Sequence, residues 1–233
     1  MVKFRVGPDQ KICRVHRNLV CCKVPYVKRL LDDDFDDGST ESKPLRLHVP
    51  CDPAVFGLFT DWLYGNLAPR QIIRKGDTDA WDSLLLYLIK CYMFAESIEL
   101  PSLMDHVMLL LLSAYQHHDS VSGQADIRFV YEHGSPSSQL RKLMAYNFHW
   151  YVTRRGLYKT TFEEYDRMVH EVPGLSMDFL ESLQEGVVSR RLWNGCQYHV
   201  GSCLEDECLL SSVGKGEMEK RYEVLGEDES GSE

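Results

Sequence analysis

The chain has 233 residues, a hydrophobic fraction of 44% and a formal net charge of −9. This is enough apolar material for a real core in one large domain, or in one ordinary domain and a smaller one. The acidic balance repels phosphate backbones, so we do not expect direct nucleic-acid binding. The eight cysteines are scattered along the chain, which is typical of reduced thiols rather than of a small disulfide framework.

No stretch predicts a secretory signal or a membrane span. Residues 1–5 lack the apolar region of a signal peptide. The longest apolar run, Val107 to Leu112, is far too short to cross a bilayer. We therefore expect an intracellular protein that does not contact membranes, in the nucleus or the cytoplasm.

The first part of the chain alternates between strand and helix patterns. Residues 2–6 alternate apolar and basic side chains and predict a half-buried strand, and a turn follows at 7–9. Residues 12–15 predict a second strand, and from 16 to 31 the apolar positions take helical spacing. Residues 45–49 alternate again and predict a third strand.

An acidic segment with one aromatic residue, 32–39, precedes the third strand. It can be a solvated loop that keeps the protein soluble. Alternatively, it is a contact loop that presents Phe35 to a partner, because an exposed aromatic among acids is unusual unless it packs or binds.

Three helices are expected next. Asp52-Pro53 predicts an N-cap followed by proline at the first helical position, in a helix that reaches Tyr64. Its broad apolar face includes Trp62, which we expect in the core. Further helices are predicted over 84–95 and 103–112, the second apolar on almost all sides.

The second half of the chain is predicted to be helical after a polar break at 117–124. A short helix is expected over 126–133. Ser135-Pro136 predicts the start of the next helix, Thr161-x-x-Glu164 has capping-box spacing, and Ser176 is expected to cap a last helix. We expect these helices to pack together and against the first half.

Motifs in this order resemble those of a BTB/POZ domain. They are Val15-His16-Arg17-x-Leu19, Val24-Pro25-Tyr26-Val27, Pro53-x-Val55-Phe56-x-x-Phe59-x-x-Trp62-Leu63-Tyr64-Gly65, and the helix pair over 84–95 and 103–112. With Val130-Tyr131-Glu132 and Leu140-Arg141 downstream, the chain is similar to fungal BTB proteins. The resemblance implies an α+β fold in which a small sheet is capped by helical hairpins, followed by an all-helical extension.

Four segments are therefore expected. Residues 1–113 would form the BTB/POZ-like interaction domain, 124–190 the helical extension, and 191–213 a segment rich in Cys and His. Residues 214–233, with three basic and seven acidic side chains, are too polar to fold alone and are expected to be a disordered acidic tail.

The resemblance also implies protein–protein contact rather than catalysis. BTB domains self-associate or recruit cullin scaffolds, acting as substrate adaptors of ubiquitin ligases. Cullin-binding members present an apolar residue, a spacer and Glu before the third strand. The nearest match here is Phe35-Asp36-Asp37, with Asp in place of Glu. The expected partner is a cullin scaffold or another BTB protein.

Catalytic motifs are missing from the sequence, which contains no Gly-x-Ser-x-Gly, phosphate-binding glycine loop or His-Glu-x-x-His. His16 has no nucleophile or orienting acid at recognisable spacing, so we interpret it as a hydrogen-bonded histidine in or near the core. We do not expect an enzyme.

One cluster could bind metal. Cys196, His199, Cys203 and Cys208 are four N/S ligands of the kind that tetrahedral zinc prefers, although their spacing is not that of a standard finger. The alternative is a set of reduced thiols in a loop. If zinc binds, the alternative interpretation is a non-ligase scaffold or transcription-associated factor with a zinc-stabilised C-terminal segment. No other cofactor is expected.

Overall fold

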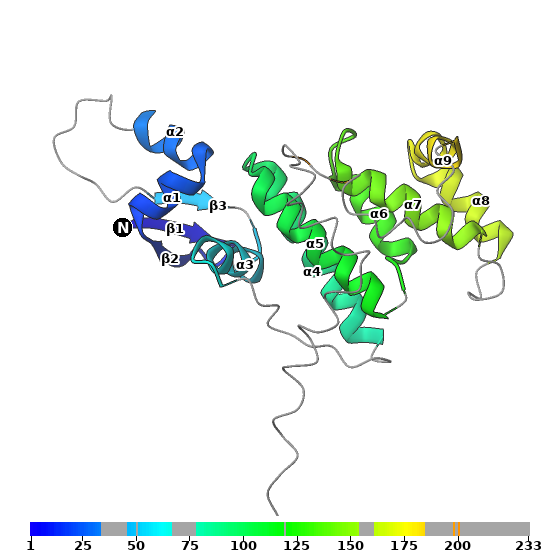
Figure 1. Ribbon diagram of the computed structural model, residues 1–233, viewed down its shortest axis with the longest axis horizontal. Coiled ribbons are helices and arrows are strands. Elements are labelled where there is room, and N and C mark those ends of the chain that lie inside the picture. Colours follow the sequence, from blue (N-terminus) through cyan, green and yellow to red (C-terminus); the bar gives the residue numbers. More distant parts are fainter. Residues whose placement is uncertain are drawn as a thin grey trace, which may run out of the picture. The chain divides into compact units, whose positions relative to one another are not determined.

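The computed structural model describes residues 1–33, 46–49, 51–66, 78–118, 120–153, 161–184, 198 and 200. These residues form three strands and nine helices (Figure 1). In chain order they are β1 (Val2–Val6), β2 (Lys11–Val15), α1 (Arg17–Lys23), α2 (Pro25–Asp33), β3 (Arg46–Val49), α3 (Pro53–Leu63), α4 (Thr78–Ser97), α5 (Pro101–His118), α6 (Gln124–His133), α7 (Gln139–Thr153), α8 (Phe162–Glu171) and α9 (Leu175–Gln184). The described chain is α+β, as the sequence predicts.

The three predicted strands form one small sheet with the order β2-β1-β3. β1 pairs antiparallel with β2 and parallel with β3. Val2, Phe4 and Val6 of β1 are all at most 2% exposed, so this alternate set makes one face of the sheet part of the core. The turn before β2 places Gly7 at a φ of +71°, a conformation that glycine adopts without strain.

The helical pattern after β2 consists of two helices rather than one. α1 ends at Lys23 and α2 begins at Pro25. Proline has no backbone N–H, and it also disfavours helical backbone at the residue before it. Val24 accordingly has a non-helical φ of −125° and ψ of 88°, and its buried side chain closes the corner between α1 and α2.

The chain divides into two compact units. Unit 1 contains residues 1–73 and 90–104, and unit 2 contains residues 74–89 and 105–233. Both units are therefore discontinuous in sequence, and each is described by itself below. The sequence-based segments 1–113, 124–190, 191–213 and 214–233 stay predictions.

Unit 1 has an aromatic core centred on Phe56 of α3. The Phe56 ring centroid lies 5.1 Å from that of Phe4, 5.3 Å from that of Phe59 and 6.4 Å from that of Phe94. Trp62 is only partly buried, so its expected place in the core is wrong. It stacks at the edge on Phe59, and the Lys23 ammonium lies 5.4 Å from its ring centroid.

Two of the predicted helix caps are confirmed. Asp52 Oδ1 accepts a hydrogen bond of 2.8 Å from the N–H of Ala54 at the start of α3. At α8, Glu164 accepts the Thr161 N–H at 2.8 Å while Thr161 Oγ1 accepts the Glu164 N–H at 3.3 Å, a reciprocal capping box.

Two other helix starts differ from the prediction. Ser135-Pro136 forms a turn in which the Ser138 N–H donates to the Ser135 carbonyl, and α7 begins at Gln139. The Ser138 hydroxyl takes the capping role and accepts the Leu140 N–H at 3.2 Å. α9 begins at Leu175, so Ser176 lies inside its first turn instead of capping it.

Unit 2 is built around buried faces of α5, α6 and α7. α5 runs to His118, past the start of the predicted polar break, and Val121 and Ser122 in that break are buried. The Tyr115 hydroxyl hydrogen-bonds to Ser122 and accepts the Asn147 Nδ2–H at 3.1 Å. No described helix combines the length and the apolar composition needed to span a membrane.

Asp126 makes the stability of unit 2 depend on pH. Burial raises the pKa of its carboxyl from 3.8 to about 6, against a hydrogen bond of 3.2 Å from the Gly123 N–H that favours the charged form. The folded state therefore holds this proton more tightly than the unfolded state. The protonated Asp126 carboxyl therefore contributes its full stabilisation of unit 2 below about pH 4, and this contribution is lost as the pH rises through about 6.

We expect Asp126→Asn to raise the free energy of unfolding at neutral pH by about 1–2 kcal/mol, allowing for solvent screening. The amide stays neutral and can still accept the Gly123 N–H. Urea titrations of both proteins at acidic and at neutral pH measure the difference. An equal dependence on pH in the two proteins would contradict this role of Asp126.

Candidate protein-interaction surface

The predicted partner-binding and zinc-binding residues lie outside the described part of the chain. Phe35, Asp36 and Asp37 of the expected partner-binding loop are among them. So are all of the candidate zinc ligands, Cys196, His199, Cys203 and Cys208. Within the described ranges, no group of three or more His, Cys, Asp or Glu residues is arranged to hold a metal ion.

Two neighbours of the candidate zinc ligands are described. Tyr198 is fully buried, and its ring meets that of Tyr146 of α7 edge to face at 6.1 Å. The N–H of Val200 donates to Asp105 Oδ1 of α5 at 2.9 Å. Two points between Cys196 and Cys203 are therefore attached to the helices of unit 2.

His16 has a hydrogen-bond partner. Its Nδ1 lies 2.8 Å from the Tyr64 hydroxyl, which also accepts the His16 backbone N–H at 3.2 Å. The side chain is exposed, so its expected place in or near the core is wrong in that respect. The interaction with Tyr64 joins the start of α1 to the end of α3.

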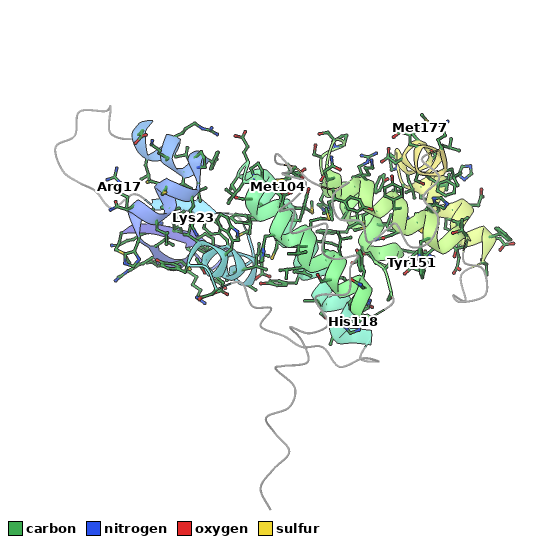
Figure 2. All side chains as sticks on the ribbon, in the orientation of Figure 1. Arg17, Lys23, Met104, His118, Tyr151 and Met177 are labelled. Atoms are coloured by element: carbon green, nitrogen blue, oxygen red, sulfur yellow. The ribbon has the colours of Figure 1, made fainter. Side chains whose placement is uncertain are left out.

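The main surface feature of unit 2 is an apolar stripe on α9. Met177, Leu180 and Leu183 are 60%, 52% and 43% exposed. At about 100° per residue they occupy one outward arc of roughly 120° on the helix. We name these three residues the α9 face; Met177 is labelled on α9 in Figure 2. Leu180 and Leu183 are apolar positions of the last predicted helix, which is expected to pack against the other helices, but the structure leaves both exposed.

A polar cluster attaches the inner side of α9 to the rest of unit 2. Asp178 Oδ2 accepts the Tyr131 hydroxyl at 2.7 Å and Arg141 Nε at 2.8 Å. The Arg141 guanidinium also lies 4.2 Å from the Tyr131 ring centroid. Burial and the Asp178 carboxylate raise the pKa of Tyr131, so its phenol stays a hydrogen-bond donor.

A second set of contacts fixes α9 one turn later. Phe179 meets the rings of Phe148 and His149 edge to face at 5.2 and 5.9 Å. The Ser182 hydroxyl donates to the Phe179 carbonyl at 2.7 Å and lies 3.2 Å from His149 Nδ1. Burial lowers the pKa of His149, so the ring is neutral near pH 7. Because its inner side is held in this way, α9 presents its apolar face on a rigid support.

A pocket of about 160 Å³ lies between the start of α7 and α9. Ser138, Arg141 and Lys142 line it on one side, and Asp178 and Glu181 of α9 on the other. Gln139 Oε1 is buried at this pocket without a hydrogen-bond partner among the described residues. The α9 face therefore lies beside a polar pocket that contains an unused hydrogen-bond acceptor.

A scan against protein-family models, a search of curated proteins and a search of solved structures each found no match to this chain.

Proposed function

We propose that the chain is a protein–protein interaction module of the BTB/POZ type, which acts as a substrate adaptor for a cullin-type ubiquitin ligase. The observation that carries the interaction role is the α9 face. Three large apolar side chains are exposed on a helix whose inner side is fixed by Asp178 and Phe179. Such a patch costs free energy in water and is typical of a surface that a partner covers.

The charges around the α9 face indicate its partner. Glu181 is exposed on the same helix, and α8, which contacts α9, exposes Glu163 and Asp166 together with one cation, Arg167. The third exposed acid of α8, Glu171, is paired with Arg128 at 2.8 Å. Apolar side chains beside a surface with an excess of acids suit an amphipathic helix whose polar flank is basic. We assign this role to the client protein that the adaptor would carry.

Unit 1 supports the BTB/POZ part of the proposal. The resemblance implies a small sheet capped by helical hairpins. The described residues contain a sheet of order β2-β1-β3, followed along the chain by α3, with the hairpin α1–α2 inserted before β3. Direct titration with a purified cullin N-terminal region tests the ligase role, and a lack of binding at high protein concentration would exclude it.

Leu180→Asp tests the α9 face. We expect it to remove client proteins from affinity purifications of the full chain without lowering the melting temperature, because Leu180 is half exposed. Phe162→Asp is the matched control, since Phe162 is 57% exposed at the first position of α8. Each client found in this way is then purified, and its affinity is measured for the wild-type chain and for Leu180→Asp. We expect binding to the wild type and at least about tenfold weaker binding to Leu180→Asp, the scale of an apolar hot spot. Equal binding would contradict the role of α9.

A second candidate function is the zinc-stabilised scaffold. The anchored residues Tyr198 and Val200 favour it, because they attach the Cys/His segment to α5 and α7. Zinc bound by cysteine and histidine would order that segment further.

Metal analysis of protein purified without chelator tests the scaffold. We expect about one equivalent of zinc per chain, and loss of that zinc together with faster proteolysis of residues 191–213 in Cys203→Ser. Less than about a tenth of an equivalent would leave these residues as ordinary thiols.

A further inference from the structure

The outer face of the sheet in unit 1 is basic although the chain as a whole is acidic. β1 places Lys3 and Arg5 on the side opposite its buried residues. In the antiparallel register Lys3 faces Arg14 of β2, and Arg5 faces Ile12. We name these four residues the basic sheet face. Ile12, which faces Arg5 and lies two residues from Arg14 on the same strand, is 61% exposed.

This arrangement is unfavourable for the isolated protein. Like charges directly opposite each other on a sheet are destabilising. Arg5 donates a hydrogen bond of 3.1 Å to the neutral side chain of Gln10, and no ion pair of Lys3, Arg5 or Arg14 is present in the described chain. A net charge of −9 means that acidic side chains were available to neutralise this face. A cationic surface around an exposed isoleucine is therefore a feature that folding does not require.

β2 is also an edge strand. In the sheet order β2-β1-β3 it has one strand neighbour among the described residues. Its burial pattern leaves Lys11, Ile12 and Arg14 exposed. Basic residues on an edge strand can prevent aggregation with other sheets. That purpose explains Lys11 and Arg14 but explains neither the exposed isoleucine between them nor the cations on β1.

We propose that β2 binds an acidic extended peptide of another protein, which pairs with its free edge as an added strand. Ile12 and Arg14 are two residues apart on the same face of β2. The peptide would therefore carry an apolar residue beside Ile12 and a carboxylate beside Arg14, also two residues apart. Lys3 and Arg5, one strand further in, extend the positive field over the same face.

The charges and the geometry favour a peptide over the alternatives. Long polyanions such as nucleic acids and anionic membranes would approach a protein of net charge −9 and be repelled by most of its surface. A second copy of β2 would bring a second set of the same cations, Lys11 and Arg14, to this edge. A short acidic segment meets only the local field and gains main-chain hydrogen bonds from the edge. This interface is on unit 1 and is independent of the α9 face.

The peptide Thr-Glu-Thr-Val-Thr-Glu-Thr-Val-Thr, carrying a fluorescent label, is the probe. Its binding to the full chain is followed by fluorescence anisotropy. We expect saturable binding that weakens with added salt, and at least about tenfold weaker binding to Arg14→Glu. Lys28→Glu is the matched control, because Lys28 is an exposed cation on a helix, α2, and not on a strand of the sheet, and it should change the affinity less than about twofold. Arg14→Gln, which removes the charge without reversing it, should give an intermediate loss.

Two modified peptides separate edge pairing from simple charge attraction. Replacing Glu with Lys should abolish binding, and N-methylation of alternate backbone amides should do so while keeping every charge. The proposal is overturned if the N-methylated or Lys peptide binds as tightly as the original, or if Arg14→Glu binds normally. It is also overturned if an oligothymidylate or phosphatidylserine vesicles bind this face more tightly than the peptide does.

Discussion

Phe56→Ala is expected to lower the free energy of unfolding of unit 1 by about 3–5 kcal/mol, the range for large aromatic truncations in a core. Phe56 is 1% exposed, and its ring is in contact range of Phe4 from β1, Phe59 from α3 and Phe94 from α4. Removing the ring would leave a cavity bounded by a strand and two helices. These elements cannot all move inward to fill it, so the cost should lie at the upper end of that range.

Trp62→Ala is the control for this prediction. The two aromatic residues are on the same helix, but Trp62 is partly exposed, stacks on Phe59 at the edge of the cluster and lies under the Lys23 ammonium. Its loss removes less buried area and leaves a hollow that water can enter. Urea titration should give a clearly lower midpoint for Phe56→Ala than for Trp62→Ala. The opposite order would mean that α3 buries the face that carries Trp62 and not the face that carries Phe56.

Asp178→Ala is expected to cost about 3 kcal/mol and to detach α9 from unit 2. The single carboxylate accepts hydrogen bonds from both Tyr131 and Arg141. The Arg141 side chain is only 12% exposed. Truncation would leave that guanidinium without its counter-charge and the Tyr131 hydroxyl without its acceptor, and such unpaired buried groups cost more than the intact pair contributes.

Asp178→Asn separates the charge of this residue from its hydrogen bonding. The amide oxygen can still accept one donor but supplies no negative charge, so we expect a loss between those of the wild type and Asp178→Ala. Proteolysis within α9 should increase in the same order. If the urea midpoint of unfolding of Asp178→Ala equals that of the wild type, the cluster with Tyr131 and Arg141 does not hold α9 in place.

The parts of the fold that could be predicted from the sequence are those that depend on local chemistry. Alternation in β1 marks its two faces, and the side chains of Asp52 and Thr161 cap helices through backbone groups a few residues away. The interruption at Pro25 was also encoded locally, but the apolar spacing on both sides concealed it. Caps and strands thus need no information from distant segments.

The predictions that were wrong concern side chains whose burial depends on contacts with residues far away in the sequence. Trp62 and Phe59 are both apolar positions of α3, and only packing against Phe94 determines which one is central. On α9 the apolar residues extend around most of the helix, so the sequence cannot show that Phe179 points inward while Leu180 points outward. In the Asp178 cluster, Asp178 is 37 positions from Arg141 and 47 positions from Tyr131 in sequence, and no local pattern detects contacts over such separations.

The discontinuous composition of unit 1 has a consequence for synthesis on the ribosome. Phe56 and Phe59 are translated well before Phe94, which completes their cluster and lies 38 residues after Phe56. At about 5–20 residues per second, this interval lasts about 2–8 s. During that time the nascent chain exposes two phenylalanines that the finished protein buries. Chaperones that recognise aromatic segments should therefore associate with the translating chain until Phe94 emerges, and then dissociate.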